Sequence, residues 1–111
     1  MPVPVQEKLR AVVEDLGSQA RVARALGVSA SRVSRWLKQG EEPDPENRRK
    51  LEGLEFVLAR ALSFMQPDTA VKWLHGSEPF LNNFAPIDVL ARGRVTEVLA
   101  ALDGFQAGSF A

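Results

Sequence analysis

The sequence predicts an all-α fold. Proline and glycine divide the chain into helix-length blocks, apolar residues within the blocks recur at steps of three and four, and no segment alternates apolar and polar residues between hairpin turns. With 111 residues, 45% of them hydrophobic and 25% charged, the chain has the size of one domain, or of two small helical subdomains that share a core.

Three helices are predicted in the first part of the chain. The first ends at Gly17, a second short helix covers residues 18–26, and a third covers residues 30–38. Gly27 and Gly40 follow the second and the third helix and are typical of helix ends. The apolar face of the first helix consists of Val5, Leu9, Val12, Val13 and Leu16.

Proline marks the start of the helices predicted in the second part. A long helix begins at Pro45, and its broad apolar stripe is expected to lie between two subdomains or at a dimer interface. The stripe consists of Leu51, Leu54, Val57, Leu58, Ala61, Leu62 and Met65. Pro67 begins a short helix, residues 75–85 form a loop, and Pro86 and Gly93 mark two final helices.

The composition excludes several classes of function. The chain has no cysteine, so disulfides, thiolate zinc sites and cysteine nucleophiles are absent. His75 is the only histidine, which leaves a metal centre or a Ser/His/Asp triad with one imidazole at most. No apolar run approaches the roughly 20 residues of a membrane span, and no signal-peptide core follows Met1. We expect a cytoplasmic protein that is not an enzyme and holds no metal or cofactor.

The charges are balanced overall but unevenly distributed. Basic and acidic residues number 14 each, yet residues 1–40 have a net charge of +4 and the remainder has −4. Such an asymmetry favours a basic module that contacts phosphate, joined to an acidic module with a different partner.

The strongest motif covers residues 18–37. Its small Ala23 allows two helices to cross closely, and Gly27 makes the tight turn between them. Apolar side chains that fill the wedge between the helices are Val28, Val33 and Leu37. This pattern is similar to a helix-turn-helix of the Cro/phage-repressor (Xre) type, a motif that places its second helix in the major groove of DNA.

This resemblance implies a set of DNA contacts. Arg32 and Arg35 lie three residues apart on one helical face, so one can bind guanine while the other contacts phosphate, and the sequence leaves their roles open. Arg21 and Arg24 either add salt-dependent affinity or form an ordinary solvated face, whereas Trp36 is expected in the core. The expected contact residues are Gln19, Ala30, Ser31, Arg32, Ser34, Arg35 and Lys38.

The second half carries its own series of residues, most of them apolar. The series is Val71, Lys72, Trp73, Leu74, Leu81, Ala85, Pro86, Ile87, Asp88, Val89, Leu90, Gly93, Val95, Val98 and Leu99. It is similar to the toxin-binding domain of Xre/MbcA/ParS-type antitoxins of RES-Xre type II toxin-antitoxin systems, where an Xre-like half precedes it. We therefore expect a helix-turn-helix domain with the long connecting helix over residues 1–66 and a toxin-binding domain over residues 67–111.

Two departures from the family pattern lie in the predicted loop. Ser77-Glu78 stands where the family usually has Pro-Asn, and Asn82-Asn83 replaces the commoner glycines. Asparagine tolerates left-handed backbone, so the turn is expected to survive while contacts with a partner differ. We expect Trp73, Leu81 and Leu90 in the core and His75 exposed in the loop.

The antitoxin resemblance implies a partner and a mechanism. The partner is a RES-domain toxin that consumes NAD or transfers ADP-ribose, and the antitoxin covers its active site. Residues 104–111 are expected to form a flexible, uncharged tail, although Phe110 has packing on its own helix as an alternative. The expected toxin-binding residues are Gly108, Ser109, Phe110 and Ala111.

The same resemblance implies repression of the antitoxin's own operon by a homodimer formed through the middle and C-terminal helices. A rival hypothesis is a stand-alone helix-turn-helix repressor whose second half only dimerises or binds a ligand. The rival differs in having no protein partner.

Overall fold

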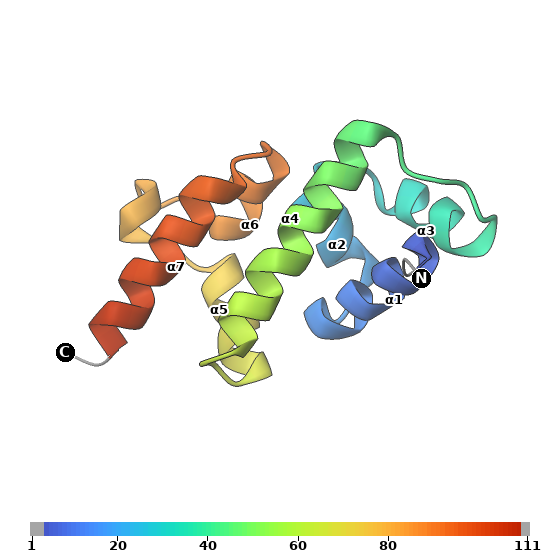
Figure 1. The fold of residues 1–111 in the computed structure, drawn as a ribbon. Coiled ribbons are helices and arrows are strands. Elements are labelled where there is room, and N and C mark those ends of the chain that lie inside the picture. The colour runs from blue at the N-terminus through green and yellow to red at the C-terminus, as the bar shows by residue number, and fades with distance from the viewer. Residues whose placement is uncertain (1–3, 110–111) are drawn as a thin grey trace.

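The computed structural model describes residues 4–109, which fold into helices without any strand (Figure 1). The elements are α1 (Val5–Leu16), α2 (Gln19–Leu26), α3 (Ala30–Lys38), α4 (Pro45–Leu62), α5 (Pro67–His75), the short 3₁₀ helix η1 (Pro79–Leu81), α6 (Pro86–Ala91) and α7 (Val95–Ser109). The predicted all-α class with a helix-turn-helix at its start is confirmed.

Local sequence signals explain most helix boundaries. The Ser18 hydroxyl accepts a hydrogen bond from the Arg21 amide at the start of α2, and the Ser29 hydroxyl accepts one from the Arg32 amide at the start of α3, both at 3.2 Å. Gly17 adopts left-handed backbone (φ 100°) at the end of α1. Helices α4, α5 and α6 each begin with proline, whose fixed φ suits the first turn.

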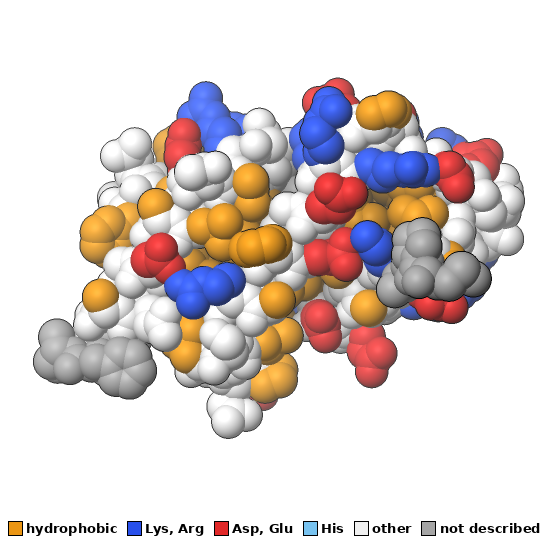
Figure 2. All heavy atoms as spheres, in the orientation of Figure 1, with side chains coloured by type: hydrophobic (Ala, Val, Ile, Leu, Met, Phe, Trp, Pro, Cys, Tyr) orange, Lys and Arg blue, Asp and Glu red, His pale blue; other side chains and the backbone are white. Residues whose placement is uncertain are grey.

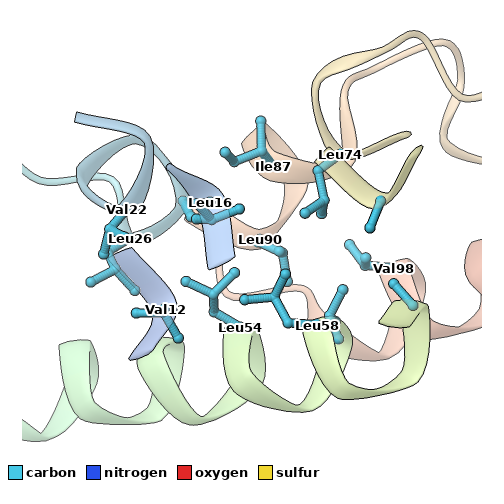
Figure 3. Close-up of a cluster of buried hydrophobic side chains, with 14 of the residues drawn as sticks. Val12, Leu16, Val22, Leu26, Leu54, Leu58, Leu74, Ile87, Leu90 and Val98 are labelled. Carbon is cyan, nitrogen blue, oxygen red and sulfur yellow. The ribbon is translucent and has the colours of Figure 1, made fainter. Parts of the chain in front are cut away.

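Helix α4 lies between the two halves of the chain (Figure 1) and contributes to the cores of both (Figure 3). Leu54 is fully buried and Leu58 is 2% exposed. Side chains of α1 and α2 approach α4 on one side, and those of α5, α6 and α7 approach it further along; they include Val12, Leu16, Val22 and Leu26 from the first half and Leu74, Ile87, Leu90 and Val98 from the second (Figure 3). The stripe predicted for α4 therefore lies between two helical groups.

The two halves also meet directly, because α6 packs against α2. Gly27, at the turn between α2 and α3, has left-handed backbone (φ 71°), and a Cβ there would lie 3.2 Å from the carbonyl oxygen of Ala91. Arg24 donates from Nε and Nη2 to the two carboxylate oxygens of Asp88, each at 2.9 Å. Arg24 is thus paired with Asp88 and is not part of an ordinary solvated helix face, which is one of the two alternatives predicted for this residue.

The last helix extends further than the sequence indicated. The expectation that residues from 104 form a tail is wrong as far as Ser109, because α7 continues through Gly104. A Cβ on Gly104 would lie 2.8 Å from Cε2 of Phe80, so the phenylalanine ring occupies that space. Phe105, one residue on, lies half-buried with its ring centroid 6.4 Å from Phe64 and 6.1 Å from Trp73. These contacts hold the last turns of α7 in place.

The segment 75–85 also differs in detail from a plain loop. It contains η1, and His75 closes α5 half-buried, with Nδ1 2.8 Å from the Val71 carbonyl oxygen, so its expected exposure is wrong. Trp36, Trp73, Leu81 and Leu90 are buried as expected.

The Arg24–Asp88 pair makes a pH-dependent contribution to stability. The hydrogen bond from Arg24, helped by the charges of Arg24, Arg92 and His75, lowers the pKa of Asp88 in spite of desolvation. A carboxylate with a lowered pKa stabilises the fold above its unfolded pKa and loses this contribution as the pH falls. Asp88→Asn should lower the unfolding free energy by up to about 1 kcal/mol at neutral pH.

The difference should shrink as the pH falls below 3.8, the ordinary value for aspartate. Urea unfolding of both proteins over a pH series measures it. Asp68→Asn is the matched control, because Asp68 is exposed and makes no ion pair with the described residues. If the unfolding free energy of Asp88→Asn stayed below that of the wild type by the same amount at every pH, the stabilising role of the Arg24–Asp88 pair would be contradicted.

Candidate functional site

Helix α3 exposes one face of small and basic side chains. The opposite face packs on the core through Val33 and Trp36, which are 0% and 2% exposed. The residues on the accessible face are Ala30, Ser31, Ser34, Arg35 and Lys38. Small side chains near the start of the helix allow close approach of a duplex, and the cations near its end can contact phosphate. The arrangement matches what a recognition helix requires.

Both arginines of α3 form ion pairs with the segment that links α3 to α4. We call residues 41–44 the acidic connector. Arg32 Nη2 donates to Asp44 Oδ1 at 3.2 Å, and the Arg32 guanidinium carbon lies 5.6 Å from the centroid of the Trp36 ring. Arg35 Nε lies 3.6 Å from Glu41 Oε2. Arg32 is therefore directed to the side of the accessible face, whereas Arg35 belongs to that face.

The other polar side chains considered for DNA binding, on α2 and at the end of α3, differ in their surroundings. Gln19 is the first residue of α2 and is half-buried beside the Ser18 cap. Lys38, at the end of α3, is exposed and makes no ion pair with residues 4–109. Arg21 donates from Nη1 to the Leu16 carbonyl oxygen at 2.7 Å, which ties it to the end of α1.

The loop between α5 and α6 is organised by a buried carboxylate that the sequence did not predict. Glu78 is 4% exposed, and its Oε2 accepts a hydrogen bond from Trp73 Nε1 at 2.8 Å. Its Oε1 accepts from the Phe80 amide at 3.0 Å, at the start of η1. The Glu78 carbonyl oxygen accepts from the amides of Leu81 and Asn83, both at 2.9 Å. The Glu at this departure from the family pattern holds the loop together.

The same loop presents two aromatic side chains to solvent. Asn82 and Asn83 adopt left-handed backbone (φ 55° and 66°), as their residue type predicted. Phe80 and Phe84 are 68% and 48% exposed, and the Arg92 guanidinium lies 5.2 Å from the Phe84 ring centroid. Together with Val89, Arg94, Glu97 and neighbouring residues they line a groove of about 330 Å³, which we call the aromatic groove.

The sequence did not predict this groove. The available signal was the pair of phenylalanines inside a segment predicted as a loop, since large exposed apolar side chains in one patch are typical of binding surfaces. Its neighbour in space is α7, because the Phe80 ring packs on Gly104.

The C-terminal end of α7 is accessible. Gly108 is exposed, and no atom lies within 4 Å of the position that a Cβ would take. Ser109 is the last residue of the helix, while Phe110 and Ala111 lie outside the described residues. The end of α7 and helix α3 are at opposite ends of a molecule that measures 47 × 26 × 22 Å (Figure 1).

Residues 4–109 contain no group of three or more His, Cys, Asp or Glu side chains that could hold a metal ion. No helix among them combines the length and the apolar character needed to cross a bilayer.

Comparisons with known proteins find similarity to antitoxins. No family model matches it. The chain is 29% identical over 94 residues to the probable mycobacterial cidal antitoxin Rv3188 of Mycobacterium tuberculosis (strain ATCC 25618 / H37Rv), and the match covers 84% of this chain and 79% of the relative. A chain in the crystal structure of the M. tuberculosis MbcT-MbcA toxin-antitoxin complex has the same fold, with a TM-score of 0.78, 23% identity, and coverage of 99% of this chain and 100% of that one.

Sequence and fold thus show similarity to the same class of proteins, small all-helical antitoxins, and the chain shares their fold. The resemblance to MbcA-type antitoxins that the two halves of the sequence indicate is confirmed by both comparisons.

The buried Glu78 carboxylate generates a stability prediction. Glu78→Ala should lower the unfolding free energy by about 1 to 3 kcal/mol, because it leaves the Trp73 indole N–H buried without an acceptor. Glu78→Gln keeps one acceptor oxygen and should cost less. Urea unfolding with tryptophan fluorescence measures both, and an alanine variant as stable as the wild type would contradict this role for Glu78.

Proposed function

We propose that this chain neutralises a cognate RES-domain toxin and represses its own operon. The observation that carries the proposal is the extent of the similarity, since the match to the antitoxin relative and the match in fold both span the two halves of the chain. In this proposal residues 1–66 bind DNA and residues 67–111 bind the toxin. The toxin consumes NAD or transfers ADP-ribose, and this chain does neither.

The toxin is proposed to contact the end of α7 and the aromatic groove together. The Phe80 ring packs on Gly104, and Gly108 lies about one helical turn further along α7, so the two features are continuous. The exposed rings of Phe80 and Phe84 offer apolar area for a stable contact. Residues 108–111 are slim and uncharged, which suits entry into an active-site cleft.

A chain that ends at Ala107 should keep its fold and inhibit the toxin about tenfold less well or worse, because it lacks the aromatic anchor Phe110. This cut leaves Phe105 in contact with Phe64 and Trp73, whereas a cut before residue 104 would remove it from the core. NAD consumption by the RES-domain protein that co-purifies with the tagged full chain, titrated with each antitoxin, measures inhibition. Full inhibition by the shortened, folded chain would exclude insertion of residues 108–111.

DNA binding is proposed through the accessible face of α3. Arg35 and Lys38 lie on this face, and small residues precede them, so the helix can enter a major groove. Because α3 and the end of α7 are at opposite ends of the molecule, operator and toxin can be bound at the same time (Figure 1).

A homodimer is proposed through α4 and α7. Hydrophobic side chains gather over these two helices in the centre of the face shown in Figure 2. Phe56 of α4 is 63% exposed and adds apolar area to this helix, and a contiguous exposed apolar patch is typical of an interface. A two-fold dimer would set two copies of α3 about one turn of DNA apart and predicts a pseudo-palindromic operator.

Arg35→Ala with Lys38→Ala should weaken binding to the DNA upstream of the gene about tenfold or more and lower the salt slope by about two. Fluorescence anisotropy at several salt concentrations measures both quantities. Arg92→Ala with Arg94→Ala removes the same charge from the other half and should leave DNA affinity nearly unchanged. An equal loss in both double variants would mean that overall charge, and not α3, determines binding.

A further inference from the structure

The acidic connector lies beside the recognition helix in a defined conformation. In Figure 1 the chain leaves the end of α3 and runs along the edge of the molecule to the start of α4. Pro43 within it is buried, and so is Asn47 in the first turn of α4. Asn47 Nδ2 donates to Asp44 Oδ1 at 2.6 Å, and the same oxygen accepts from Arg32. The hydrogen bond from Asn47 therefore fixes the position of the carboxylate that pairs with Arg32.

The electrostatic environment of Asp44 favours its charged form. The hydrogen bond from Asn47 is the main cause that lowers the pKa of Asp44, with backbone hydrogen bonds and the charge of Arg32 as further causes. Asp44 therefore remains a carboxylate across the neutral pH range and stays available to the Arg32 guanidinium.

The connector matches the charge of α3. Helix α3 has the three cations Arg32, Arg35 and Lys38, and the connector has three carboxylates. Two of these carboxylates, Glu41 and Asp44, are directed to α3, whereas Glu42 pairs with Arg48 of α4. The positive charge of residues 1–40 is thus reduced at the helix that would contact DNA.

These ion pairs can be exchanged for others. The side chains of Arg32 and Arg35 are 43% and 49% exposed, and those of Asp44 and Glu41 are 42% and 52% exposed. Exposed ion pairs of this kind contribute little to stability, so a DNA phosphate can displace a carboxylate, but each displacement subtracts from the net affinity.

We propose that the acidic connector is an intramolecular competitor of DNA, in which Asp44 and Glu41 occupy the guanidinium groups of Arg32 and Arg35 that phosphate would otherwise contact. The connector thereby lowers the affinity of α3 for DNA. This inference rests on the DNA binding proposed above and adds a regulatory element to it.

The test compares two double variants that remove equal charge from the same stretch of chain. Glu41→Gln with Asp44→Asn releases Arg32 and Arg35. Asparagine also suits the helix-capping position and can keep the contact with Asn47. Circular dichroism and urea unfolding check that each variant folds like the wild type.

The matched control is Glu42→Gln with Glu46→Gln. Glu42 and Glu46 pair with Arg48 and Lys50, so this variant releases two cations of α4 and none of α3. Binding is measured by anisotropy with the DNA fragment upstream of the gene and with a mixed-sequence duplex of equal length, over a range of salt concentrations. The variant that releases Arg32 and Arg35 should bind both probes about three- to tenfold more tightly, and the control should change by less than about twofold.

Each other outcome overturns the proposal in a distinguishable way. Equal tightening in both variants would mean that only the overall charge matters. If the wild type binds DNA and neither variant changes its affinity, the connector is not a competitor, and the proposed DNA-binding function is unaffected. No binding by the wild type or by any variant would overturn the DNA-binding function as well.

Discussion

The burial of α4 from two directions is the constraint on which the rest of the structure depends. Leu54 and Leu58 lie in one continuous core with side chains from α1 and α2 along one part of α4 and from α5, α6 and α7 further along it (Figure 3). A domain of about this size buries only part of the surface that its unfolded chain exposes, so neither half has much apolar area to spare. Sharing α4 lets each half complete the core of the other, and the two halves are therefore expected to unfold together.

The contact between α2 and α6 turns this shared core into a defined orientation of the helix-turn-helix. Ala91 approaches the turn at Gly27, where a side chain would meet its carbonyl oxygen, and the Arg24–Asp88 pair closes the same interface. One side of α2 is covered as a result, while α3 keeps its outer face accessible. Because the end of α7 lies at the other end of the molecule, the two proposed partners have separate surfaces on one fold (Figure 1).

Folding brings together charges that are separated in the sequence. The sequence shows a basic first part and an acidic second part, which favours phosphate binding by the first. In the structure Arg24 meets Asp88, Arg32 meets Asp44 and Arg35 meets Glu41, so acidic residues of the second part reach back to cations of the first. Much of the asymmetry in sequence becomes local neutralisation in space, whereas Lys38, like Arg10, forms no ion pair with the described residues.

The sequence by itself determined the elements whose signals are local: the capping serines, the turn at Gly27, the prolines that begin helices, and the apolar stripe of α4. Those features depend on backbone preferences and periodicity within a few residues. Only the tertiary structure decided the partner of Arg24, which is 64 residues away, and the burial of Glu78 beside Trp73. It also decided that α7 continues through Gly104. Glycine often ends a helix, but here the Phe80 ring packs against it within the helix. These features depend on which distant side chains meet, and no local pattern specifies that.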